Sequence, residues 1–225
     1  MTTLNHPWNQ FDQADQGDED INVLFAAVGK AISSWETMES HLGSIFADLC
    51  GPQNEAPFRA YGTVSSSRGR ISMIREAYAV STLSEFMDDD LSNLLGDVEK
   101  FAARRNDIAH GLVQHRVVHD KDRGHFWGPP TYNSKRQPSK AEHDMMMQRE
   151  ADDWHKGLQG SYSYNSAQID HYTAEFSKLA ERAFDIRMTF QRRHVERVIA
   201  LEKFRNSEGP FNPPQPDRPT PSPTK

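Results

Sequence analysis

Prolines divide this chain into segments of different character. Seven of the 13 prolines lie between Pro210 and Pro223, and the others leave two long spans without proline, residues 58–128 and 139–209. A proline inside a helix removes a backbone hydrogen bond and costs about 3 kcal/mol, so these two spans can hold long helices. The proline-rich end, residues 208–225, is predicted to be a disordered tail outside the core.

Apolar residues recur at helical spacing in several stretches. The clearest stretch, residues 21–49, stops just before Gly51 and a proline, which predicts one long helix. A second helix is predicted over 58–78, although two glycines and a run of serines weaken it. A third is predicted over 91–109, where leucines, Val, Phe and Ile follow the same spacing.

The pattern changes after the third long helix. Valines, aromatic residues and glycines over 112–138 predict a short β-hairpin and an irregular loop. A short polar helix is predicted over 139–155, and a last long helix over 169–204 follows a capping pattern formed by Asn165 and Gln168. The predicted fold is all-α, an up-down bundle of about five helices with a small β insertion.

Composition and the chain ends set the domain plan. Residues 1–18 are polar and acidic and are predicted to be a flexible tail, which leaves residues 19–207 as one helical domain. No apolar run approaches the roughly 18 residues that a membrane span needs, and the first ten residues lack a signal-peptide pattern. We therefore expect a cytoplasmic protein without a membrane partner. The single cysteine, Cys50, excludes an intrachain disulfide.

Charge is distributed unevenly along the chain. The formal net charge of −6 argues against indiscriminate binding of nucleic acid. Residues 101–140, however, contain eight lysines and arginines against three aspartates, and four arginines lie between 59 and 75 without any acid. These stretches are either solvated helix faces or local sites for a polyanion.

The third predicted helix ends in a group of residues that can carry chemistry, Arg104-Arg105-Asn106-Asp107-Ile108-Ala109-His110-Gly111. On a helix, Asn106 and Asp107 lie four and three residues before His110, so both can share its face. Arg105 points about 140° away around the axis, yet its long side chain can reach toward a shared phosphate. A histidine can move protons near neutral pH, and an arginine can stabilise charge on phosphoryl oxygens without a metal.

The arginine, four intervening residues and histidine resemble the signature of the HEPN superfamily, all-α domains that frequently act as metal-independent endoribonucleases. The resemblance implies a homodimer in which two copies of this helix line one cleft and RNA is cut through attack by its 2′-hydroxyl. It implies an acid/base role for His110, phosphate binding for Arg105, and orientation of the histidine or phosphate by Asn106. A bacterial defence or toxin system, with an antitoxin or regulatory protein as a further partner, is the corresponding expectation. Leu112 stands where silenced toxins of this family commonly have a tyrosine, so regulation through modification of that tyrosine is not favoured.

Further residues are candidates for RNA contact. Arg104 lies beside the motif, and the basic insertion contains residues that can bind phosphate or stack on unpaired bases. These candidates are Arg116, Trp127 and Tyr132 in the insertion, with Arg68 and Arg70 in the second predicted helix.

The motif residues are also compatible with roles other than catalysis. A histidine in a last helical turn followed by Gly111 is an ordinary helix end, favoured by the helix dipole and a glycine cap. If the motif is not catalytic, two alternatives remain. The chain is either a HEPN-like module that binds nucleotide, RNA or protein, or a plain helical scaffold. His110, His115, His119 and His125 lack an accompanying carboxylate or cysteine framework, so neither a metal nor a cofactor is predicted.

Overall fold

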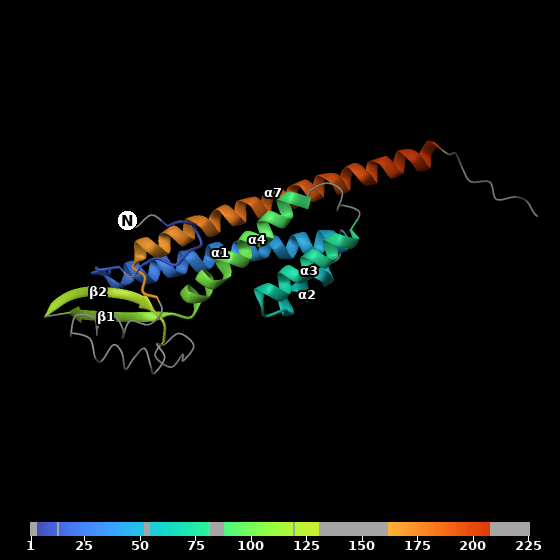
Figure 1. Ribbon diagram of the computed structural model, residues 1–225. Helices are drawn as coiled ribbons and strands as arrows, with labels where there is room; N and C mark the ends of the chain where they lie inside the picture. Colours follow the sequence, from blue (N-terminus) through green and yellow to red (C-terminus); the bar gives the residue numbers. More distant parts are fainter. Residues whose placement is uncertain are drawn as a thin grey trace, which may run out of the picture.

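The structure is a computed structural model that describes residues 4–12, 14–51, 55–81, 88–118, 120–130 and 162–207. The protein is mostly helical, with a small two-stranded antiparallel hairpin (Figure 1). This confirms the predicted combination of helices and a β insertion. The described elements are α1 (Ile21–Cys50), α2 (Glu55–Thr63), α3 (Ser67–Val80), α4 (Asp88–Ala109), β1 (Leu112–Val118), β2 (Lys121–Gly128) and α7 (Ser166–Ser207).

Helix α1 confirms the first predicted helix. Asp20 caps its start, because the carboxylate accepts a hydrogen bond of 2.8 Å from the backbone N–H of Asn22. The helix stops at Gly51, whose φ of 120° is unfavourable for a residue with a side chain. The apolar side chains of α1, Trp35 among them, face the core.

The single helix predicted over 58–78 is wrong in one respect, because two helices occupy this stretch. Helix α2 ends at Thr63, and α3 begins only at Ser67. The hydroxyl of Ser66 accepts a hydrogen bond of 3.1 Å from the N–H of Gly69 and caps the new helix. The serine run therefore offers the backbone an N-cap that competes with a continuous helix.

Three long helices form the body of the protein. Helices α1 and α7 run in the same direction along each other, since Ser34 contacts Ser177 and, further along both helices, Asp48 contacts Arg187. Helix α4 lies on the same pair and runs in the opposite direction (Figure 1). Asp97, near the middle of α4, forms an ion pair of 2.8 Å with Arg182 of α7.

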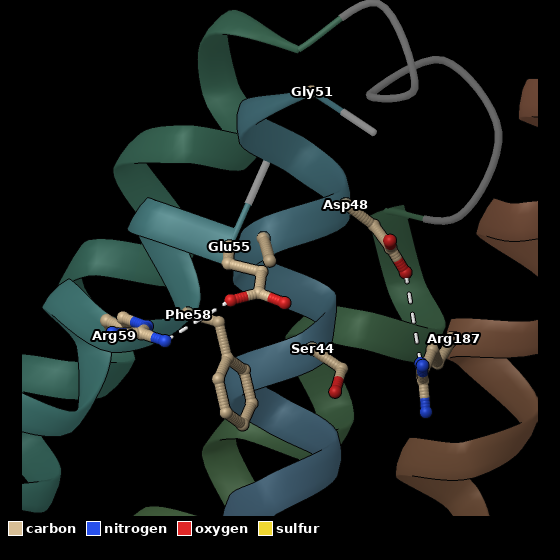
Figure 2. Close-up of a pocket in the computed structure, with 8 residues that line it drawn as sticks. Ser44, Asp48, Gly51, Glu55, Phe58, Arg59 and Arg187 are labelled. Atoms are coloured by element: carbon tan, nitrogen blue, oxygen red, sulfur yellow. Dashed lines mark hydrogen bonds and ion pairs between the residues drawn. The ribbon is translucent and has the colours of Figure 1, made fainter. Parts of the chain in front are cut away.

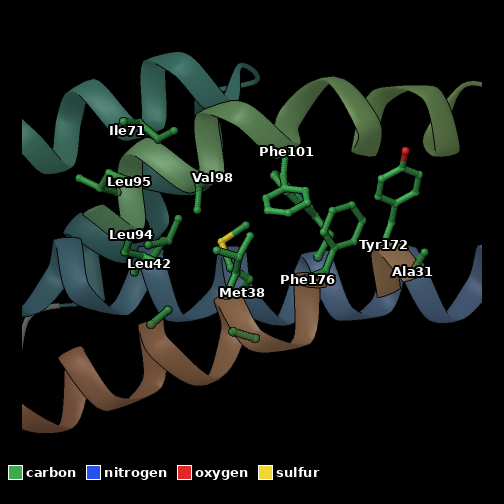
Figure 3. Packing of buried hydrophobic residues seen from close by; sticks show 14 of the residues in the cluster. Ala31, Met38, Leu42, Ile71, Leu94, Leu95, Val98, Phe101, Tyr172 and Phe176 are labelled. Carbon is green, nitrogen blue, oxygen red and sulfur yellow. The ribbon is translucent and has the colours of Figure 1, made fainter. Parts of the chain in front are cut away.

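The core fills the space between these three helices. Phe176 of α7 packs against Trp35 of α1 at 5.0 Å and against Phe101 of α4 at 5.9 Å, measured between ring centroids. Figure 3 shows Met38 and Leu42 of α1 facing the α4 side chains in the same layer. This packing of apolar side chains from all three helices supplies the main stabilising contribution to the fold.

The hairpin lies at the end of the body where α4 finishes. Strands β1 and β2 pair from Leu112 opposite Gly128 to Val118 opposite Lys121, with an irregularity in register between Arg116 and Val117. Helix α7 begins nearby with the predicted cap. Asn165 and Gln168 exchange hydrogen bonds of 3.1 and 3.2 Å between side chain and backbone N–H.

The start of the chain differs from the mobile acidic tail predicted over residues 1–18. In its described part, Phe11 is buried against Tyr172 of α7. Asp18 extends the hairpin, because its N–H donates to the carbonyl of His125 and its own carbonyl accepts from the N–H of the same residue. Apolar and backbone contacts thus attach this polar segment to the body, although its composition suggested full solvation.

Several predictions fall on residues outside the described part of the chain. They are the irregular loop from 131 to 138 with Tyr132, the short polar helix over 139–155, and the proline-rich tail over 208–225.

Candidate functional site

The motif forms the last turn of α4, next to the hairpin (Figure 1). The N–H of His110 donates to the carbonyl of Asn106 over 3.1 Å, which is the helical hydrogen bond that places these two residues one turn apart. The side chain of His110 is exposed, and those of Arg105 and Asn106 are partly exposed. All three candidate catalytic residues therefore have access to solvent.

The guanidinium of Arg105 is already engaged within the chain. It forms an ion pair of 3.3 Å with Glu36 of α1 and donates a weak hydrogen bond of 3.4 Å to the side-chain oxygen of Asn106. The side chain of Glu36 is 55% exposed, and ion pairs with an exposed partner contribute little free energy. A phosphate group could therefore replace Glu36 as the partner of Arg105 at small cost.

The neighbouring guanidinium, that of Arg104, faces the interior, so the structure does not support it as an RNA-binding group. It lies 3.2 Å from the carboxylate of Asp107, and both side chains are largely buried, with 13% and 9% exposed. The hydroxyl of Tyr164 lies 3.1 Å from Arg104 and 3.2 Å from the same carboxylate. Burial, together with the nearby Tyr172 and Asp107, raises the pKa of Tyr164 far above its ordinary value, so this hydroxyl stays protonated.

This cluster also changes the expected face of Asp107. Its carboxylate contacts Arg104 and the hydroxyl of Tyr164, because a buried carboxylate is stable only with charged or hydrogen-bonding partners. Asp107 lies three residues from both Arg104 and His110, so spacing alone did not predict the contacts with Arg104 and Tyr164.

Two aromatic side chains hold the end of the motif helix. The indole N–H of Trp127 donates to the carbonyl of Ile108 over 2.9 Å, and the hydroxyl of Tyr162 donates to the carbonyl of Asp107 over 2.9 Å. These carbonyls belong to the last turn, where no further helical N–H is available to them. Trp127 and Tyr162 thus position the backbone that carries His110.

Gly111 makes this arrangement sterically feasible. A Cβ atom at this position would overlap the indole nitrogen of Trp127, so a larger residue would push the ring away from the helix end. The structure does not support the expected stacking of bases on Trp127, because its ring is buried against the helix end, with 8% exposed.

The other basic candidates also have internal partners. The guanidinium of Arg116 lies 4.2 Å from the centre of the Phe126 ring and donates to the hydroxyl of Ser163 over 2.6 Å. Burial lowers the pKa of Arg116 to about 10. Neither its partners nor its burial fits an open phosphate-binding site.

The two arginines of α3 behave differently from each other. Arg70 forms an ion pair of 3.1 Å with the buried Glu39 and donates to the carbonyl of Val64 over 2.8 Å. It therefore secures the turn between α2 and α3. Arg68 is exposed, and it is the one RNA-binding candidate among the described residues with an open side chain.

Sequence reasoning missed Glu36 and Tyr162 as neighbours of the motif. Glu36 is one of several polar residues in α1, and nothing in its spacing indicates a contact with a residue 69 positions later. Tyr162 lies just before the start of α7, outside every helical pattern. Only the folded chain brings them to the end of α4.

The structure also contains a hollow far from the motif, at the end of α1 (Figure 2). Its volume is about 620 Å³. Burial raises the pKa of Asp48 in its wall, in spite of the nearby Arg187. The residues that line it are Ser44, Ala47, Asp48, Gly51, Glu55, Phe58, Arg59 and Arg187; we call it the α1 hollow.

Within the described ranges, no three histidine, cysteine or acidic side chains are arranged to bind a metal ion. In the same part of the chain, no helix has an apolar stretch long enough to span a membrane. Comparisons with protein-family models, with curated proteins and with solved structures found no match for this chain.

Proposed function

We propose that the chain is a HEPN-like, metal-independent endoribonuclease whose helices follow the up-down arrangement of that superfamily. The observation that supports the proposal most strongly is the solvent access of Arg105, Asn106 and His110 on the last turn of α4. The neighbouring contacts of Trp127 and Tyr162 hold this turn in place, and a fixed backbone is what a positioned acid/base group needs.

In the proposed reaction, the 2′-hydroxyl of a ribose attacks the adjacent phosphorus. Its proton passes to a base, and the 5′-oxygen of the next nucleotide leaves with a proton from an acid, which yields a 2′,3′-cyclic phosphate and a free 5′-hydroxyl. His110 supplies one of these proton-transfer groups. Arg105 leaves Glu36 and stabilises the negative charge on the phosphoryl oxygens, while Asn106 orients the histidine or the phosphate.

A second copy of the motif would supply the other proton-transfer group. We therefore propose a homodimer in which two α4 ends line one cleft, in a cytoplasmic bacterial defence or toxin system with an antitoxin or regulatory partner. These assignments follow from the resemblance of the Arg105-to-His110 segment to the superfamily.

Cleavage is tested by incubating the purified protein with total RNA in the presence of a chelator. We expect RNA fragments with 2′,3′-cyclic phosphate ends, and at least a 100-fold slower reaction for His110→Ala, which is the low end of the usual contribution of acid–base catalysis. His115→Ala is the matched control, because His115 is also exposed and lies on the adjacent strand β1. Equal cleavage by His110→Ala and the parent would remove the catalytic role.

Glu36→Gln tests the role of Arg105 separately. The substitution removes the carboxylate that lies 3.3 Å from the guanidinium, so we expect a lower KM for RNA with little change in kcat. A higher KM would show that Glu36 helps RNA binding, which would contradict the exchange of Glu36 for phosphate.

The competing function is a non-catalytic HEPN-like module. The existing partners of Arg105 favour it, since an arginine bound to Glu36 and Asn106 can also serve structure. Arg105→Ala distinguishes the two: loss of cleavage with folding and association intact supports the enzyme, whereas absence of cleavage in the parent and loss of association in the variant support the module.

A further inference from the structure

Helix α7 continues well beyond the helix that it packs on. Its contacts with α1 end near Arg187, which meets Asp48 just before α1 finishes at Cys50. Its last buried residue is Phe190, which stacks on Tyr78 of α3. All side chains from 195 to 206 are exposed, and Figure 1 shows this part of α7 projecting away from the other helices.

One face of α7 stays apolar across the point where α1 ends. Phe184, Met188, Val195, Val198 and Ile199 lie within an arc of about 100° around the helix axis. The exposed fractions of these side chains are 44%, 41%, 56%, 41% and 46%. We call this row the α7 stripe; it begins on the attached half of the helix and continues onto the projecting half.

A projecting helix of this kind is not stable alone in water. Isolated helices of this length gain little from their own hydrogen bonds, and most helices in proteins depend on packing of an apolar face. Contiguous exposed apolar side chains also mark sites of association. The α7 stripe therefore needs a partner surface.

The charges on the two halves of α7 favour a second copy of this chain as that partner. The projecting half, residues 191–207, has five lysines and arginines against two glutamates, whereas on the attached half Glu181 and Asp185 flank the stripe on one side and Arg187 borders it on the other. A parallel pair of two α7 helices would place basic half against basic half. An antiparallel pair places the basic half of each copy against the acidic flank of the other.

We propose that two copies of this chain associate through antiparallel pairing of their α7 stripes. In a register centred near residue 193, Met188 lies opposite the partner's Val198. The same register places Glu181 opposite the partner's Arg205. Both halves of each stripe are then covered, because the projecting half of one chain lies on the attached half of the other.

The α1 hollow lies beside this pairing and gains an occupant from it. Arg187 borders both the hollow and the stripe, and Phe58, 44% exposed, lines the hollow from α2 (Figure 2). In the same antiparallel register, the partner's Leu201 lies next to Arg187 and over the hollow. Leu201 is 59% exposed in the single chain. The pairing would therefore cover two apolar side chains that the single chain leaves exposed, the partner's Leu201 and Phe58 in the hollow.

This contact is distinct from the pairing of α4 ends. The motif lies by the hairpin, and the projecting half of α7 lies at the opposite end of the protein (Figure 1). The proposal therefore does not depend on nuclease activity, and a chain that uses both contacts would form assemblies larger than a dimer.

Sedimentation of the full chain tests the pairing. We expect Val195→Glu combined with Val198→Glu to remove one association step that the parent shows at micromolar concentration. Ala200→Glu is the matched control, because Ala200 is also exposed but lies on the opposite face of the helix. Circular dichroism checks that the double variant keeps its helical content. Equal masses for the parent and a folded double variant would overturn the proposal and would mean that the projecting half binds a different partner.

Charge reversal tests the antiparallel register. Glu181→Arg and Arg205→Glu should each weaken association about 5- to 10-fold, which corresponds to about 1 kcal/mol for a like-charge contact, and the two together should restore it. Absence of restoration contradicts the pairing of Glu181 with Arg205.

Spin labels give the helix direction directly. With Cys50→Ser and Asn206→Cys, an antiparallel pair centred near residue 193 places the two labels about 40 Å apart, at 1.5 Å of rise per residue. A parallel pair would place them about 10 Å apart. The short distance would contradict the proposal.

Discussion

The two ends of this protein expose different kinds of side chain. At the end of α4, the exposed group is the imidazole of His110, and buried donors from Trp127 and Tyr162 hold the backbone beneath it. On the projecting half of α7, the exposed groups include the aliphatic side chains of Val195 and Val198, which are 56% and 41% exposed.

This difference separates the proposed site for chemistry from the proposed surface for association. Chemistry needs polar groups held by a rigid surrounding structure, and that is the situation at the motif. Association needs apolar area that is not yet covered, and that is the situation on the α7 stripe. Substitutions of the residues that support the motif should therefore lower the free energy of unfolding strongly. Substitutions on the α7 stripe should change it very little in the single chain.

The largest effect is expected for Trp127→Ala. This substitution removes a buried indole and the hydrogen bond to the carbonyl of Ile108, so the free energy of unfolding should fall by about 3–5 kcal/mol. Urea denaturation measures it. Trp127→Phe, which keeps an aromatic ring but not the N–H, should cost about 1 kcal/mol. A loss below about 1 kcal/mol for the alanine variant would show that the hairpin does not support the motif.

Two adjacent arginines test the same comparison on a finer scale. Arg104→Ala leaves the buried carboxylate of Asp107 without its cation and should lower the free energy of unfolding by about 3 kcal/mol. Arg105→Ala breaks the exposed pair with Glu36 and the weak hydrogen bond to Asn106, and it should cost less than about 1 kcal/mol. Parallel urea titrations of both variants check the difference. Equal losses would contradict the division into a structural and a functional arginine.

A smaller, pH-dependent effect is expected at Asp97, in the middle of the body. Burial alone would raise its pKa, but hydrogen bonds from Arg182 and Lys100 outweigh burial and lower it below the ordinary value of 3.8. A depressed pKa stabilises the folded state above the unfolded pKa, and this contribution is lost as pH falls through the folded pKa. Asp97→Asn should thus cost about 1 kcal/mol near neutral pH and progressively less below about pH 4. A cost that is independent of pH in urea titrations would contradict this pairing.

The smallest effect on the single chain is expected at the α7 stripe. Val195→Ala shortens a side chain that is 56% exposed and lies outside the buried core, so the free energy of unfolding should change by less than about 0.5 kcal/mol at a concentration where the chain is monomeric. At higher concentration the parent should become more stable than the variant, because association stabilises the folded state. Thermal unfolding over a range of concentrations measures both. A large loss in the dilute monomer would mean that the stripe packs within its own chain.

Much of the fold could be predicted because it depends on local patterns. The α1 helix from Ile21, the cap formed by Asn165 and Gln168, and the hairpin after α4 follow from residue spacing and capping chemistry. The break at Ser66 was visible only as a weakness of the predicted helix, since a serine can either cap a new helix or point to solvent from a continuous one.

The candidate site could be predicted only in part. The motif selected Arg105, Asn106 and His110 and left Arg104 as a neighbouring candidate for RNA contact, but the sequence could not show that Arg104 is buried and Arg105 is partly exposed, because both lie on one helical turn and have the same chemistry. Arg104 contacts Asp107, one turn further along α4, and Tyr164, just before α7. Arg105 instead contacts Glu36 of α1.

By itself, the sequence determined where helices form and which segment carries an arginine, an asparagine and a histidine, since periodicity and capping act over a few neighbouring residues. Tertiary structure alone decided which of the charged and aromatic side chains are buried. That outcome depends on contacts between residues far apart in the chain, such as Trp127 with Ile108, Arg105 with Glu36, and the point at which α1 ends beneath α7. Burial changes the free energy of a charge or an indole by several kcal/mol, so these distant contacts decide which side chains stabilise the fold and which remain accessible to solvent.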